Sequence, residues 1–252
     1  DPNKRIEEDY LRIIRFIRFS LEYQNKIEKS TVEALKLNLN GIKKISKERI
    51  LLEFFKILKL KNIIQINHND TLKELFLLIF PELKYLERLS KLNKIFQELF
   101  VEKDILLAIL LIDEKNNQKY FSHKYKISND LKDKLNMWSQ NFIKSQENKN
   151  FFYKDLKKNI FYFGKEHIQS LNLINFSINK KNKSEDYRSL SAAIKKTILP
   201  KFPFDGNYIK NKGINEGVVI GKILNLLQEE WLNNNFKISD KKVLKIISDQ
   251  KN

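Results

Sequence analysis

The stretch RIEEDYLRIIRFIRFSL, residues 5–21, decides which fold class this sequence adopts. On a helix, at about 100° per residue, its apolar side chains gather on one arc. These are Ile6, Tyr10, Ile13, Ile14, Ile17 and Leu21. The opposite arc carries Arg5, Glu8, Asp9, Arg12, Arg15, Phe16 and Phe19. The stretch therefore predicts one amphipathic helix with a core face and a charged outer face.

The same periodicity runs through most of the chain. Only six Gly and four Pro occur in 252 residues, which leaves few positions for hairpin turns. Further helices are expected at 31–39, 47–60, 104–113, 129–146, 153–175, 185–198, 217–235 and 239–249. The apolar run ILLAILLI at 105–112 is predicted to be a buried helix. The sequence therefore predicts an all-α fold.

Capping residues mark several expected helix ends. Asn40-Gly41 is predicted to cap the C-terminus of a helix, and Ser46 to cap the N-terminus of the next. Thr71 and Glu74 have the spacing of a capping box. Pro81 is expected to end that helix and to begin another. The stretch PKFPFDGNYIKNKGINEGVVIG, residues 200–221, is predicted to be one long structured loop.

The amino-acid composition limits the classes of partner and site that this protein can have. The formal net charge is +17, which favours a polyanionic partner such as nucleic acid. The alternative explanation of the positive charge is a codon bias toward Lys, Asn and Ile. Cys is absent, which excludes disulfides and thiol chemistry, and the three His have no metal-ligand spacing. The longest apolar run is shorter than the ~20 residues of a membrane span, and no signal peptide is visible, so a cytoplasmic protein is expected.

The charged face of the first helix has two interpretations. Glu8 and Arg12 are spaced i,i+4, and Asp9 and Arg12 i,i+3, so the three side chains are expected to meet. A carboxylate accepts hydrogen bonds and a guanidinium donates them. Side by side they match the amino group and ring nitrogen of cytosine or adenine, and they mismatch uracil and guanine. The alternative is a solvated face with weak ion pairs.

Three motifs, in order, resemble the tRNA nucleotidyltransferase/poly(A) polymerase superfamily, and CCA-adding enzymes in particular. The first, DPNKRIEEDYLRIIRFIRF, matches through Glu8, Asp9, Arg12, Arg15, Arg18 and Phe19. The second, SKERILLEFFKIL at 46–58, matches through Glu48, Arg49, Ile50 and Glu53. The third, FPFDGNYIKNKGINEGVVIGKILNLLQEEW, matches through Gly213, Gly217, Gly221 and Trp231. It departs from the family pattern at Tyr208 and Val218.

The resemblance implies roles for particular residues. Asp9 and Arg12 would pair with incoming CTP and then ATP as a protein template, and Glu8 would brace Arg12. Support of the neck helix would come from Arg15, Glu48, Arg49 and Glu53. A contact with RNA phosphate would come from Gly213, Gly217 and Lys222, although a rigid packing corner is an equal interpretation of the glycines.

The resemblance also implies a domain plan and partners. It gives an elongated arrangement with a neck at 1–60, a helical body at 61–198 and a tail at 199–252, which together hold tRNA. Family members begin with a catalytic head that binds Mg²⁺ through paired carboxylates. No Gly-Gly and no Asp-x-Asp occurs here. The chain is therefore interpreted as a portion without the head, with no catalytic residue, no metal or cofactor of its own, and no activity alone.

Several alternatives stay open at this point. A poly(A) polymerase, or a relative that adds only CC or only A, would carry the same motifs. A stand-alone, non-catalytic RNA-binding helical protein is a further alternative. The sequence also leaves open whether the head is absent from the gene, the oligomeric state, and which basic residues touch RNA.

Overall fold

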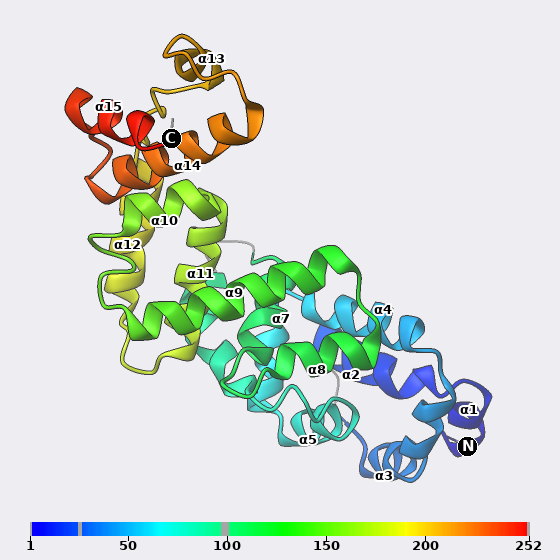
Figure 1. Ribbon diagram of the computed structural model, residues 1–252. Coiled ribbons are helices and arrows are strands. Elements are labelled where there is room, and N and C mark those ends of the chain that lie inside the picture. The colour runs from blue at the N-terminus through cyan, green and yellow to red at the C-terminus, as the bar shows by residue number, and fades with distance from the viewer. Residues whose placement is uncertain (1, 25–26, 97–100, 251–252) are drawn as a thin grey trace. The chain divides into compact units, whose positions relative to one another are not determined.

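A computed structural model describes residues 2–24, 27–96 and 101–250, which contain helices and no strand (Figure 1). This confirms the predicted all-α fold. The α-helices are α1 Pro2–Glu8, α2 Leu11–Tyr23, α3 Lys29–Leu37, α4 Lys47–Leu58, α5 Asp70–Ile79, α6 Asn93–Phe96, α7 Lys103–Leu111, α8 Asn117–Tyr125, α9 Asn129–Glu147, α10 Leu156–Phe163, α11 Lys165–Ile178, α12 Ser184–Lys196, α13 Gly206–Lys210, α14 Gly217–Asn233 and α15 Asp240–Ser248. Three 3-10 helices are η1 Leu39–Lys44, η2 Ile63–His68 and η3 Leu86–Leu92. No described helix is long and apolar enough to cross a membrane.

The chain divides into two compact units. Unit 1 comprises Asp1–Lys149 and Gln169–Ser191, and unit 2 comprises Asn150–Ile168 and Ala192–Asn252. Each unit is therefore described by itself. The division into neck, body and tail at residues 60 and 198 stays a prediction.

The core of unit 1 forms where α2 packs against α4. Ile13, Ile14 and Ile17 of α2 are fully buried, as the periodicity predicted. Beyond them lies a cluster of aromatic rings, in which the ring centroids of Phe54 and Phe80 are 4.9 Å apart. Helix α7 is buried on all sides from Leu106 onward, which confirms the prediction for ILLAILLI. The buried face of α2 fixes which of its side chains point outward.

Gly41 has a different role from the one predicted. Helix α3 ends at Leu37 with Asn38 as its C-cap, and Gly41 lies inside η1. A Cβ atom at position 41 would sit only 2.0 Å from Cδ1 of Tyr10. The glycine is therefore required because the Tyr10 ring packs directly on the backbone there.

Other predicted helix ends were confirmed in part. Ser46 Oγ accepts a hydrogen bond from Arg49 N at 3.4 Å and caps α4. The predicted capping box at Thr71 is wrong, because Asn69 Oδ1 accepts from Leu72 N at 3.0 Å and starts α5 earlier. Helix α5 ends at Ile79, just before Pro81, but Pro81 begins no helix.

Two further predictions need correction. The expected helix over 153–175 is divided into α10 and α11 at Gly164, where a φ of 84° interrupts helical geometry. The predicted long loop at 200–221 contains the short helix α13, capped by Asp205 Oδ1, which accepts from Tyr208 N at 2.8 Å. Helix α8 was not among the predicted elements, because its sequence NQKYFSHKY has a weak apolar period.

Unit 2 has an aliphatic core and an aromatic cluster. The core residues are Ile209, Ile214, Ile220, Ile223, Leu227, Val243 and Ile247. Trp231 is buried, and its ring meets those of Phe161, Phe202 and Phe236 edge to face. These contacts position α14, which carries the third motif, within unit 2.

Candidate functional site

The charged stretch at the N-terminus is broken between two helices. Helix α1 ends at Glu8 and α2 begins at Leu11, so the single helix predicted over residues 5–21 is wrong. Asp9 lies at the break, and its Oδ1 accepts a hydrogen bond from Leu11 N at 3.2 Å. Tyr10 follows at the break, and its ring packs on Gly41. Asp9 therefore sits at the start of α2 and not within it.

The carboxylate of Asp9 is held by two arginines. Arg15 Nη1 lies 3.3 Å from Asp9 Oδ2, and Arg49 Nη2 lies 3.2 Å from Asp9 Oδ1. Arg49 belongs to α4, so the second contact joins the first two motifs of the sequence. The expected contact between the Asp9 and Arg12 side chains is not formed in the described structure, where the Asp9 carboxylate contacts Arg15 and Arg49 instead.

Arg12 pairs with Glu8 across the break. Arg12 Nη1 is 3.0 Å from Glu8 Oε2 and donates to the carbonyl of Arg5 at 2.7 Å. Both side chains are substantially exposed, so this ion pair contributes only about 0.3–0.5 kcal/mol to stability. Its effect is on geometry, since it anchors the guanidinium of Arg12 at Nη1.

Glu53 of α4 lies beneath the arginines of α2. Only 3% of it is exposed, yet its carboxylate meets Lys56 Nζ at 2.8 Å, Arg18 Nε at 3.2 Å and Arg15 Nε at 3.4 Å. Burial raises the pKa of Glu53, but Lys56, Arg18 and Arg15 together outweigh burial and hold that pKa below its ordinary value. A buried carboxylate with these cations fixes the positions of Arg15 and Arg18.

The second motif therefore contributes unequally to this ionic cluster. Arg49 contacts Asp9 just before α2, and Glu53 contacts Arg15 and Arg18 within α2, so both residues join α4 to the first motif. Glu48 is exposed in the first turn of α4. Its own backbone N–H and then Ser46 donate hydrogen bonds that lower the pKa of Glu48.

The glycine loop of the third motif lies in unit 2. Gly213 has a φ of 86°, in the left-handed region that favours glycine. Gly217 is the first residue of α14, whose N-cap Glu216 makes no side-chain capping bond. Gly217 and Lys222 are exposed. Contact of these residues with RNA phosphate stays a prediction.

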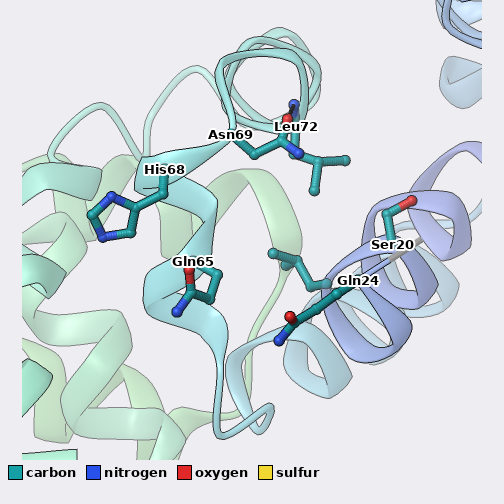
Figure 2. A pocket seen from close by; sticks show the side chains of 7 residues that line it. Ser20, Gln24, Gln65, His68, Asn69 and Leu72 are labelled. Carbon is teal, nitrogen blue, oxygen red and sulfur yellow. Dashed lines mark hydrogen bonds between the residues drawn. The ribbon is translucent and has the colours of Figure 1, made fainter. Parts of the chain in front are cut away.

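A polar hollow in unit 1 was not anticipated from the sequence. Its apolar floor is Leu21 and Leu72, and its rim is made by Ser20, Gln24, Gln65, His68 and Asn69. Figure 2 shows the α2 side chains on one side and Gln65 on the other. The Asn62 side chain donates to the backbone carbonyl of Leu21 and ties η2 to α2. Uncharged, scattered residues gave no pattern that would have indicated this site.

The chain is similar to known proteins in sequence and in fold. A family model described as "Probable RNA and SrmB- binding site of polymerase A" matches residues 26–86. The chain is 29% identical to a CCA-adding enzyme of Staphylococcus haemolyticus over 72% of this chain and 43% of that protein. It is 24% identical to the mouse mitochondrial CCA tRNA nucleotidyltransferase 1 over 97% of this chain and 56% of that protein. The chain thus spans about half the length of these relatives.

Solved structures show the same fold. A CCA-adding enzyme in complex with ATP matches with a TM-score of 0.59 and 20% identity, over 98% of this chain and 61% of that one. The complex with CTP matches with a TM-score of 0.59 and 19% identity, over 98% and 60%. The fold of this chain is therefore similar to the helical portion of these CCA-adding enzymes. Together with the match over residues 26–86, these similarities support membership of the tRNA nucleotidyltransferase/poly(A) polymerase superfamily.

Proposed function

We propose that this chain is the RNA- and nucleotide-binding portion of a cytoplasmic CCA-adding tRNA nucleotidyltransferase. Such an enzyme adds CCA to the 3′ end of tRNA from CTP and ATP. The observation that carries the proposal is the arrangement at the start of α2, where Arg12 is braced by Glu8 beside a carboxylate, Asp9, that is fixed in place.

The hydrogen-bond inventory of Asp9 supports a template role. A carboxylate offers about four lone-pair positions. Leu11 N and Arg49 occupy Oδ1, and Arg15 occupies one position on Oδ2. One acceptor position on Oδ2 is left for the amino group of cytosine or adenine. A uracil or guanine carbonyl there would meet an acceptor without a proton between them.

The hydrogen-bond donors of Arg12 complement the acceptor position on Asp9. A guanidinium has five N–H donors, and the contacts with Glu8 and Arg5 use only Nη1. Nη2 and Nε are left to donate to the ring nitrogen of the same base. Because both groups are held before a nucleotide arrives, little further ordering is needed on binding.

The remaining parts of the reaction are proposed to lie elsewhere. Nucleotide addition is a phosphoryl transfer that depends on Mg²⁺ and positioned phosphates. In this proposal a separate catalytic head domain supplies the carboxylates and the metal, and this chain alone is inactive. The tail, with Gly213, Gly217 and Lys222, would contact RNA phosphate.

The test is nucleotide selection by an enzyme in which this chain is joined to a cognate catalytic head. Asp9→Ala and Arg12→Ala should each lower incorporation of CTP and ATP by roughly 10- to 100-fold and weaken the rejection of UTP, since each removes one or two hydrogen bonds to the base. Lys119→Ala, at an exposed lysine of α8 away from this ionic cluster, is the control. Full selectivity in both variants would refute the template.

A poly(A) polymerase is the second candidate, favoured by the name of the matching family model. It would select ATP and reject CTP on the same RNA. If the joined enzyme incorporates CTP before ATP, it is a CCA-adding enzyme and not a poly(A) polymerase. A non-catalytic RNA-binding protein would bind tRNA without any dependence on Asp9 or Arg12.

A further inference from the structure

An aromatic pair lies on the outer face of α2, outside the template. Phe19 is 41% exposed and Tyr23 is 62% exposed. Counted along the helix, Phe16, Phe19 and Tyr23 follow Arg12 by four, seven and eleven residues, which places them on one face. The face that begins with the base-reading arginine therefore ends in two exposed aromatic rings.

The two rings are held in a defined arrangement. The ring centroids of Phe19 and Tyr23 are 6.0 Å apart, and the ring planes differ by 20°. The Arg18 guanidinium lies 4.1 Å from the centroid of Phe19. Arg18 is itself fixed by Glu53 at 3.2 Å and Glu22 at 3.6 Å. The exposed ring of Phe19 is thus fixed indirectly by a buried carboxylate.

Two rim residues of the polar hollow of Figure 2 are chain neighbours of this pair. Ser20 and Gln24 follow Phe19 and Tyr23 directly in the chain, so the rim begins about 4 Å from the backbone of the pair. Among the described residues, the side chains of Ser20, Gln24, Gln65 and His68 make no hydrogen bond with one another (Figure 2). Neutral donors and acceptors therefore lie beside an aromatic surface.

This combination fits one class of ligand. Aromatic rings beside cations stack on the flat faces of nucleobases, and neutral polar groups bind hydroxyls and base edges. A base inside a duplex is already stacked, so the ligand must be unpaired. We propose that Phe19 and Tyr23 form a stacking platform for an unpaired base of the RNA, with the adjoining hollow receiving its ribose.

The spacing along α2 assigns the base to the RNA strand and not to the incoming nucleotide. Seven residues at 1.5 Å separate Arg12 from Phe19 by roughly 10 Å. At about 3.4 Å per stacked nucleotide, that distance is roughly three nucleotides. The platform therefore acts on RNA affinity, whereas Asp9 and Arg12 act on nucleotide choice. The inference rests on the proposed function in taking RNA as the partner and Arg12 as the reader of the incoming nucleotide.

The experiment uses this chain and a short RNA hairpin with a single-stranded 3′ tail. 2-Aminopurine is placed at one tail position at a time, because its fluorescence falls when it stacks. Phe19→Ala and Tyr23→Ala should weaken binding by about 5- to 100-fold and restore the fluorescence at one position. Tyr23→Phe should retain both signals. Tyr120→Ala, at an exposed tyrosine of α8, is the matched control and should change neither.

Two further readings separate the alternatives. A DNA tail should bind more weakly than RNA, and Gln65→Ala should remove most of that difference, since only RNA offers a 2′-hydroxyl. Tyr23→Leu keeps apolar bulk without an aromatic face, and it should behave as Tyr23→Ala does. The 62% exposure of Tyr23 means that neither change disturbs the core.

Several outcomes would overturn the platform. Unchanged RNA affinity and quenching in Phe19→Ala and Tyr23→Ala would do so. Tyr23→Leu binding like the wild type would show apolar contact without stacking. A change in oligomeric state with RNA affinity intact would show that the pair is a protein interface. Because no nucleotide is added in this assay, loss of the template in Asp9 variants leaves its result unaffected.

Discussion

The two units of the chain carry positive charge in different ways. Of the seven arginines, five lie within the first 49 residues, and unit 2 contains none. In unit 1 the guanidinium groups of Arg12, Arg15 and Arg18 each meet a carboxylate. In unit 2 the positive charge comes from lysines, most of them at exposed positions.

The difference has a physical meaning. A guanidinium is planar and directional, so it holds a fixed geometry when carboxylates surround it. A lysine ammonium is a mobile point charge that attracts phosphate without selecting a base. In the proposed function, unit 1 is therefore suited to recognise particular chemical groups, and unit 2 to attract phosphate by charge alone.

The largest expected effect is on the fixed geometry of unit 1. Glu53→Ala leaves Arg15 and Arg18 facing a buried gap, and it should lower the free energy of unfolding by about 3 kcal/mol. Urea unfolding followed by Trp138, in a Trp231→Phe background, measures this. Glu22→Ala is the control, and it should cost under about 0.5 kcal/mol because Glu22 lies at the surface, with 38% of its side chain exposed. Equal losses in the two variants would contradict the comparison.

The units should also respond to acid at different pH. Burial lowers the pKa of His167, in unit 2, from 6.5 to about 4. Its neutral form is favoured in the folded state, so unit 2 loses stability as pH falls from 6.5 toward 4. The pKa of Glu53 lies below 4.5, so its contribution to unit 1 is lost only below that pH.

Tryptophan fluorescence distinguishes the two responses, because Trp138 lies in unit 1 and Trp231 in unit 2. The Trp231 signal should show destabilisation first, and His167→Gln should remove its dependence on pH above 4.5. If the Trp138 and Trp231 signals both reported unfolding near pH 6, protonation of Glu53 would not be what sets the acid stability of unit 1.

A smaller effect is expected on salt dependence. Replacing Lys210, Lys212 and Lys222 of unit 2 with Gln should reduce the slope of log affinity for tRNA against log salt by about 2, at roughly 0.7 per phosphate contact. The selection of CTP and ATP by the joined enzyme should be unchanged. Titrations between 50 and 200 mM salt, roughly the range over which such slopes are read, measure it. An unchanged slope would show that these three lysines of unit 2 make no contact with RNA phosphate.

The smallest effect concerns the glycine loop. Gly213→Ala places a side chain at a φ of 86° and should cost about 1–2 kcal/mol. Gly217→Ala is the matched control, since a Cβ there meets nothing within 4 Å. It should leave the melting temperature unchanged or slightly raised. Similar losses in both variants would mean that backbone conformation is not the reason for Gly213.

Local patterns predicted the fold better than the contacts of the site. The apolar face of α2 and the cap at Ser46 depend on residues within a few positions, and both were predicted. The partners of Asp9 depend on Arg49, 40 residues away. The i,i+3 and i,i+4 rules assume a continuous helix, so they gave the wrong partner for Asp9 once the helix was broken.

The exposed pair on α2 shows the same limit. Periodicity placed Phe19 on the outer face, but it gave no reason for a phenylalanine to stay there. The contacts that hold the ring come from Arg18 and, through it, from Glu53 on another helix. Such a chain of contacts becomes visible only when both helices are in place.

The fit of Tyr10 against Gly41 has a consequence for evolution of the family. The ring occupies the space that any side chain at position 41 would need. Positions 10 and 41 are therefore expected to covary. A homologue with a residue larger than glycine at position 41 should have a residue smaller than tyrosine at position 10. In a library that varies both positions, a smaller residue at position 10 should restore folding to variants that a larger residue at position 41 destabilises.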